Sequence, residues 1–226
     1  MLTTGPGIAS AADALTDAMQ AAYVPYRAAL FRTNAKAQAE AEQAIAAARS
    51  QWQAVARRFG PGPTPPYDRD PGFGATLKQV DDIYAKAEAQ IAARQLAEAH
   101  ETLEQARDLV ADLRRRNGVV TYSDHMNAYH EQMEHVLKEG ARGLAQPGGW
   151  LELAAQAGAL DYLAKRLRSE APAAMVQDPD FKPLLDGVLG SVAALRAAVV
   201  PQDEGAVRQV LGKLKEPYSR LFIRFG

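Results

Sequence analysis

The chain has 226 residues, of which 47% are apolar, and its 26 Lys and Arg residues balance 27 Asp and Glu residues. A chain of this size can bury a core without disulfides, and the absence of cysteine excludes disulfides, thiolate metal sites and cysteine nucleophiles. The near-neutral charge, without a basic stripe carrying aromatic residues, argues against a nucleic-acid partner. The sequence contains no run of 18 apolar residues, so it predicts no transmembrane segment.

Alanine, leucine, glutamate, arginine and glutamine dominate long segments whose apolar residues recur with a spacing of about 3.6 residues, so the fold class is all-α. We expect about eight helices in an antiparallel helical bundle or a stacked array of helical hairpins. In chain order, the spacing predicts helices over 9–32, 35–58, 74–93, 96–116, 124–143, 149–169, 181–199 and 204–224.

Proline and glycine are concentrated in residues 60–74, which predicts a stiff, extended connector. This connector divides an N-terminal helical hairpin, residues 1–59, from a main helical bundle, residues 75–226, and we expect both parts to pack as one domain. The first residues lack the positive region of a signal peptide and begin like a mature exported protein. We therefore favour the periplasm, with the cytoplasm as the alternative.

Two segments near the ends of the chain resemble each other. PYRAALFR begins at Pro25-Tyr26 in the first predicted helix, and PYSRLFIR begins at Pro217-Tyr218 in the last. Each proline should kink its helix or make it restart. The shared residues are offset by one position, so they indicate similar packing and not an internal repeat.

The segment AEAQIAARQLAEAHETLEQARDL, from Ala87 to Leu109, resembles the small-residue spacing of a tetratricopeptide repeat. It covers about one repeat and lacks the signature aromatic residue and proline of that family. The resemblance implies a helical scaffold that binds protein partners, in which the histidines have no chemical role.

All four histidines lie between residues 96 and 138. Asn117-Gly118 is a left-handed helix stop, and Ser123 or Asp124 is the expected cap of the next helix. Because the connection is short, the two helices should form an antiparallel hairpin. A helical wheel places His135 opposite the apolar face, where it should be exposed to solvent.

A carboxylate-rich metal site is the first chemical hypothesis for this hairpin. Counting about 1.5 Å of rise per residue from the connection puts Asp108 level with His130 and Glu104 level with Glu134. The same count puts His100 more than a turn away from His130. Three carboxylates and one imidazole suit iron, manganese or zinc. The candidate ligands are Glu104, Asp108, His130 and Glu134, with His100 beside them.

A copper site is the second hypothesis, because Met126, His130 and Met133 share one helix face and two thioethers with an imidazole suit Cu(I). A b-type haem is a third, with Met126 or His130 as one axial ligand and Met19 as the other. In the structural alternative, the methionines fill the core and His130 bonds Asp108.

The sequence therefore predicts a protein that binds a transition metal, iron or copper above all, in bacterial metal handling. We expect no turnover chemistry, because the second set of ligands that a metal-dependent oxidase needs is not found. The alternatives are the tetratricopeptide-like scaffold with protein partners and the haem-binding bundle.

Overall fold

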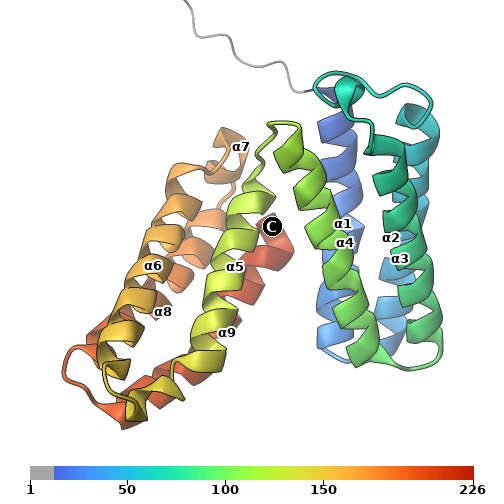
Figure 1. Ribbon diagram of the computed structural model, residues 1–226. Helices are drawn as coiled ribbons and strands as arrows, with labels where there is room; N and C mark the ends of the chain where they lie inside the picture. Colours follow the sequence, from blue (N-terminus) through green and yellow to red (C-terminus); the bar gives the residue numbers. More distant parts are fainter. Residues whose placement is uncertain (1–12) are drawn as a thin grey trace, which may run out of the picture. The chain divides into compact units, whose positions relative to one another are not determined.

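The computed structural model describes residues 13–226, and every regular element in this range is helical (Figure 1). No strand occurs between residues 13 and 226, which confirms the all-α prediction. Within the same range, no helix has both the length and the apolar character that crossing a membrane requires. The chain divides into two compact units, with the division between Val119 and Val120.

Unit 1 is a four-helix bundle in which successive helices pack on each other and the first also packs on the last. Its helices are α1 (Ala14–Asn34), α2 (Gln38–Phe59), α3 (Phe73–Ala92) and α4 (Leu96–Arg116), with the short 3-10 helix η1 (Tyr67–Arg69) between α2 and α3. Large aromatic side chains fill its core, among them Tyr26, Trp52 and Tyr84. The Trp52 indole donates a hydrogen bond to the Leu77 carbonyl at 2.9 Å, so this buried N–H is satisfied.

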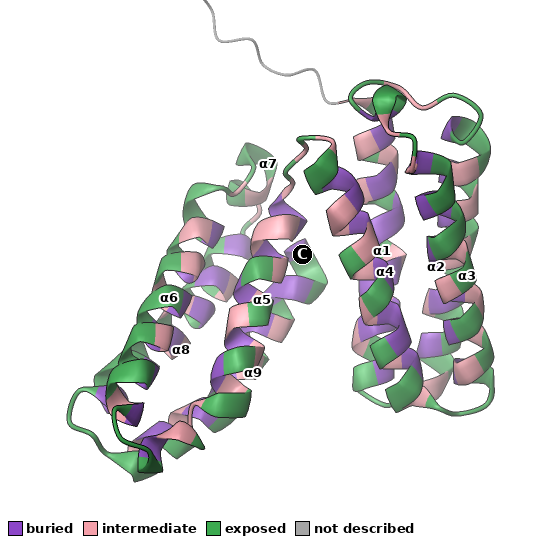
Figure 2. Ribbon diagram, in the orientation of Figure 1, coloured by how far each residue is buried: buried purple, intermediate pink, exposed green. Residues whose placement is uncertain are grey.

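Unit 2 is a second four-helix bundle, closed by the packing of its first helix on its last. Its elements are α5 (Tyr122–Glu139), the 3-10 helix η2 (Gly143–Ala145), α6 (Gly149–Ser169), the single-turn α7 (Ala173–Val176), α8 (Phe181–Val199) and α9 (Glu204–Phe225). Tyr129 and Tyr218 stack in its core with ring centroids 5.2 Å apart. Figure 2 shows the buried residues on the inner faces of the helices in each unit. Both units are closed bundles, the first of the two predicted architectures.

Three predicted helices, 96–116, 149–169 and 181–199, coincide with α4, α6 and α8. The first prediction, 9–32, begins among residues that lie outside the described range. The helix predicted over 124–143 starts earlier, because Thr121 is its cap instead of Ser123 or Asp124. The Thr121 backbone N–H donates to Asp124 Oδ2 at 2.8 Å, and its hydroxyl donates to the same oxygen at 2.9 Å.

The helices on either side of Asn117-Gly118 belong to different units. The left-handed stop itself is confirmed, since Gly118 has a φ of +71°. However, α4 packs on α3 and α1, whereas α5 packs on α6 and α9. Leu103 is fully buried in unit 1, and Tyr129 is fully buried in unit 2. The sequence predicts one hairpin here and a division at residues 60–74, but each helix buries its apolar stripe in its own bundle.

The proline-rich connector is held against the start of α1 and the end of α4. At the start of α1, the Thr16 hydroxyl lies 3.0 Å from the Tyr67 hydroxyl. At the end of α4, Arg116 Nε and Asn117 Nδ2 donate to Asp70 Oδ2 at 2.7 and 2.9 Å. The connector therefore forms a cap over one end of unit 1, in addition to joining α2 to α3.

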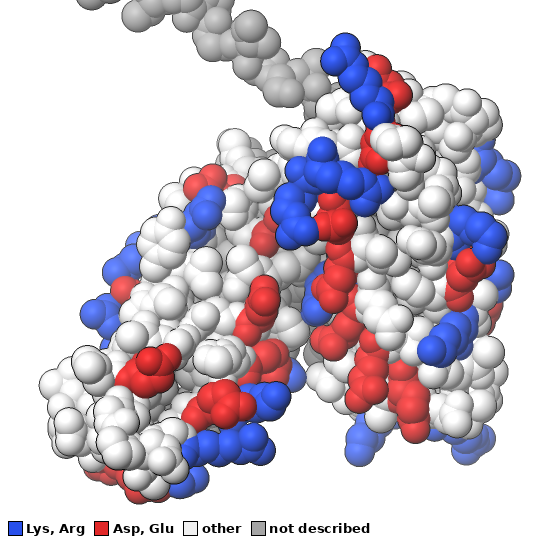
Figure 3. Space-filling model, viewed as in Figure 1, with Lys and Arg blue, Asp and Glu red and all other residues white. Residues whose placement is uncertain are grey.

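Charged side chains of both signs mix on the surface of each unit. On the face seen in Figure 3, Lys and Arg lie between Asp and Glu side chains. Several pairs are one helical turn apart, such as Lys78 with Asp82 at 2.6 Å and Arg208 with Glu204 at 2.6 Å. Such exposed pairs contribute little stability and mark solvated helix faces.

Candidate functional site

In each unit, one helix carries an imidazole and a carboxylate that lie one helical turn apart and close together. In unit 1, α4 carries His100 and Glu104, and His100 Nε2 lies 3.9 Å from Glu104 Oε1. The residues are neighbours because positions i and i+4 share a helix face. The pair lies at the margin of the core, with 24% of the His100 side chain and 34% of the Glu104 side chain exposed.

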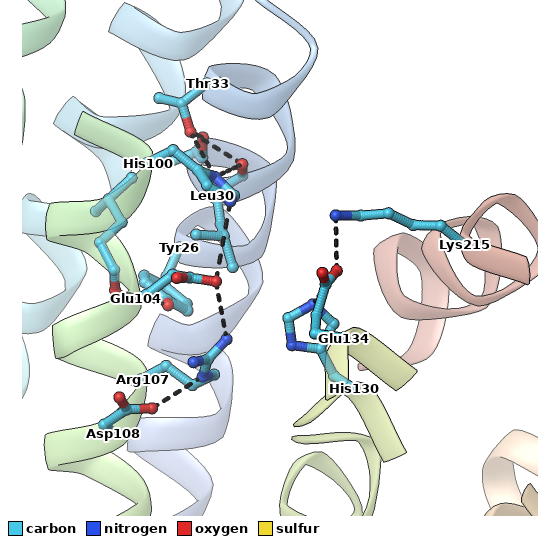
Figure 4. A network of polar contacts seen from close by, with 12 residues as sticks. Tyr26, Leu30, Thr33, His100, Glu104, Arg107, Asp108, His130, Glu134 and Lys215 are labelled. Atoms are coloured by element: carbon cyan, nitrogen blue, oxygen red, sulfur yellow. Dashed lines mark hydrogen bonds and ion pairs between the residues drawn. The ribbon is translucent and has the colours of Figure 1, made fainter. Parts of the chain in front are cut away.

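The His100 ring is held by α1. Its Nδ1 lies 3.0 Å from the Leu30 carbonyl oxygen, and Thr33 Oγ1 lies 3.4 Å from the same nitrogen (Figure 4). A carbonyl can only accept, so Nδ1 is the nitrogen that carries the proton. In the neutral ring the lone pair is then on Nε2, which faces Glu104. Histidines that bind metals usually have this arrangement, with the second ring nitrogen bonded to a carbonyl or carboxylate.

In unit 2, α5 carries His130 and Glu134, and His130 Nε2 lies 3.4 Å from Glu134 Oε1. Two residues of α9 hold this pair in place. The Tyr218 ring stacks on the His130 imidazole with centroids 5.4 Å apart, and Lys215 Nζ lies 2.7 Å from Glu134 Oε1. One-fifth of the His130 side chain and 42% of the Glu134 side chain are exposed, so the pair is open to solvent on one side.

Each carboxylate also has a cationic neighbour. The His130 imidazole and the Lys215 ammonium lower the pKa of Glu134 to about 2, against the opposing effect of burial. Glu134 is therefore ionised at any pH near neutrality. In unit 1, Arg107 Nη1 lies 3.4 Å from Glu104 Oε1, and its Nε donates to Asp108 at 3.0 Å. A metal ion that binds at either pair must therefore compete with the Lys or Arg side chain that already neighbours the carboxylate.

The two Pro-Tyr segments occupy equivalent positions beside these pairs. The Tyr26 hydroxyl donates from α1 to the Leu103 carbonyl of α4 at 2.9 Å, and the Tyr218 hydroxyl donates from α9 to the Met126 carbonyl of α5 at 3.1 Å. In each unit, a tyrosine thus joins the closing helix to the helix with the imidazole–carboxylate pair. This confirms the similar packing predicted from the sequence, although both helices continue through their prolines without restarting.

The remaining candidate residues fall into two groups. Met126 and Met133 are fully buried on the inner face of α5, so their side chains are part of the core, as the structural alternative expects. Asp108 is a surface residue, with 69% of its side chain exposed, and it pairs with Arg107. Met19, the second haem ligand in the third hypothesis, is a core residue of α1.

The predicted cluster of three carboxylates and one imidazole draws on both units, because Glu104 and Asp108 belong to unit 1 and His130 and Glu134 to unit 2. It stays a prediction. Among the residues that the structure describes, no three His, Asp or Glu side chains form a group that could hold a metal ion. Of the predicted ligands, His100 lies close to Glu104 and His130 lies close to Glu134.

The other two histidines are separate from the pairs. His125 Nε2 lies 4.0 Å from Glu170 Oε2, and His135 is exposed, as predicted. Sequence reasoning missed Lys215 and the Leu30 carbonyl, because they come from helices far from the pairs in the chain. The only sequence signal for α9 as a neighbour of the pair in unit 2 is the Pro-Tyr motif.

Comparison of the chain with protein-family models, with curated proteins and with solved structures gives no match. The site residues and their geometry are therefore the basis for a functional assignment.

Proposed function

We propose that this protein binds a divalent transition-metal ion at its imidazole–carboxylate pairs, without turnover chemistry. The observation that supports this best is the separation of 3.4 Å between His130 Nε2 and Glu134 Oε1. Two ligand atoms that are each about 2.1 Å from a tetrahedral ion lie about 3.4 Å apart. The pair would need little movement to hold such an ion, and one nitrogen with one oxygen suits zinc, iron or manganese.

The protonation states support the same proposal. Glu134 has a pKa of about 2, so its carboxylate needs no deprotonation before it binds a cation. His100 Nδ1–H donates a hydrogen bond to the Leu30 carbonyl, which leaves Nε2 as the coordinating nitrogen of the neutral ring. Each pair supplies two ligands, and water would supply the others. Both pairs would bind metal by displacing a cation, Lys215 in unit 2 and Arg107 in unit 1.

The copper and haem hypotheses have less support. The side chains of Met126 and Met133 are wholly buried, so a copper ion would have to enter the core of unit 2 to reach both sulfur atoms. A haem with Met126 as an axial ligand would likewise have to enter the core of unit 2. The periplasmic role in bacterial metal handling is a proposal drawn from the sequence.

Metal titration of the full chain, purified without a histidine tag, tests the proposal. Zinc, manganese or iron(II) should bind the native protein, and His130→Ala or Glu134→Gln should abolish binding at the unit 2 pair. The chain offers matched controls on the same helix, since His135 and Glu131 are exposed and outside the pair. His135→Ala and Glu131→Gln should leave the titration unchanged.

Thermal melts provide the second measurement. A ligand that binds only the native state at a hundred times its dissociation constant stabilises that state by about 2.7 kcal/mol. Metal binding that survives both His130→Ala and Glu134→Gln, with the unit 1 pair also changed, would contradict the proposal. A protein that neither binds nor is stabilised by any of these ions would favour the protein-binding scaffold instead.

A further inference from the structure

Asn127 of α5 has a side-chain amide without a partner. Its Nδ2 and its Oδ1 each expose less than 1 Å², and neither has a hydrogen-bond partner among the described residues. Asn117, which follows α4 in unit 1, differs in this respect. Its Nδ2 donates to Asp70 Oδ2 at 2.9 Å and to the Leu113 carbonyl at 2.7 Å.

An unpartnered amide is unfavourable at this position for two reasons. A buried donor or acceptor without a partner costs free energy, and each one in a native structure needs an explanation, such as strain, a catalytic role or a bound water or ion. Asparagine is also a poorer helix former than leucine, which would suit this half-buried position inside α5. On grounds of stability alone, asparagine is thus an unfavourable residue at position 127.

The helical spacing places Asn127 on the side of α5 that carries the imidazole–carboxylate pair. At 100° per residue, His130 lies 60° from Asn127 around the helix and Glu134 lies only 20° from it. Asn127 and His130 are separated by about 4.5 Å along the axis. The three residues thus follow one another along a single face, in the pattern Asn-x-x-His-x-x-x-Glu.

We propose that the Asn127 amide is a third member of the unit 2 metal site, where it binds the ion or one of its water ligands. This inference rests on the proposed function. A neutral amide oxygen is a hard donor, which prefers manganese, iron(II) or zinc to Cu(I). Asn127 therefore makes the site selective for hard or borderline divalent ions.

Two substitutions of Asn127 test this role in opposite directions. Asn127→Leu removes both polar atoms at similar volume, so the metal-free protein should melt at the same or a higher temperature. The same variant should bind Zn²⁺ or Mn²⁺ about tenfold more weakly, the usual result of losing a supporting group at a metal site. Asn127→Asp adds a negative charge, so it should melt at a lower temperature without metal and bind either ion more tightly.

The control is Asn117→Leu in the same full-length protein. Because the Asn117 Nδ2 group donates to both Asp70 and the Leu113 carbonyl, this variant should lower the melting temperature and leave metal affinity unchanged. If native protein binds metal through His130 and Glu134 but Asn127→Leu binds it equally well, the inference about Asn127 is wrong and the proposed function stands. If native protein binds neither ion, both are wrong.

Discussion

Asp70 should be one of the most stabilising polar residues of unit 1. Its side chain is only 6% exposed and accepts three hydrogen bonds, from Arg116 Nε at 2.7 Å, Asn117 Nδ2 at 2.9 Å and the Gly72 backbone N–H at 2.8 Å. Asp70→Asn keeps the shape but removes the charge, and it turns one acceptor into a donor that faces other donors. Hydrogen bonds to charged groups contribute about 1.5–3 kcal/mol. Since water reaches Arg116, we expect a loss of about 2 kcal/mol.

Guanidinium unfolding at pH 7, followed by circular dichroism, measures this loss. Asp82→Asn is the control, because Asp82 is exposed and pairs with Lys78, which is also exposed, and it should change stability by less than about 0.5 kcal/mol. If Asp70→Asn is as stable as the native protein, the hydrogen bonds of the connector contribute nothing and the reasoning is wrong.

The pH dependence gives an independent check. Burial raises the pKa of Asp70, but the hydrogen bonds from Asn117, Arg116 and Gly72 more than offset it, so the pKa lies below its ordinary value of 3.8. A carboxylate with a lowered pKa stabilises the fold above pH 3.8, and this contribution is lost as the pH falls through the folded-state pKa. The difference between native protein and Asp70→Asn should therefore shrink below pH 3.8. A difference that stays constant down to pH 2 would contradict the assignment.

Three further predictions concern unit 2. Tyr218→Phe removes the hydrogen bond to the Met126 carbonyl and should cost about 1 kcal/mol of unfolding free energy in a denaturant titration. Burial lowers the pKa of His125 below 6.5, so the unfolded chain binds this proton more readily; native stability should fall as the pH drops below 6.5, and His125→Gln should flatten that part of the profile. Lys215→Met removes the cation beside Glu134, so zinc should bind more tightly in calorimetry; weaker binding would show that the lysine supports the site.

The helices were predictable because their signals are local. The stretch 96–116 was bounded correctly, since Ala-rich amphipathic spacing precedes the Asn117-Gly118 stop. Thr121 was missed as a cap because Ser123 and Asp124 are equally good capping residues and stand closer to the apolar spacing. Only the contact between Thr121 and Asp124 distinguishes these candidates.

The division into units was not predictable from such signals. Leu103 and Tyr129 lie on similar apolar stripes, and the sequence does not say which bundle each stripe joins. The two pairs themselves follow from local spacing, because residues such as His130 and Glu134 meet one turn apart on any helix. It could not identify Lys215, since the approach of α9 depends on the packing of the whole unit.

The connector over unit 1 has a consequence for how that bundle can be rearranged. Tyr67 contacts the beginning of α1 and Asp70 contacts the end of α4, so the point where the chain enters the bundle and the point where it leaves lie at the same end. A short peptide could join them, and new termini could be opened in the turn between α3 and α4 at the opposite end. The order of helices along the chain would change while every contact of the core remained.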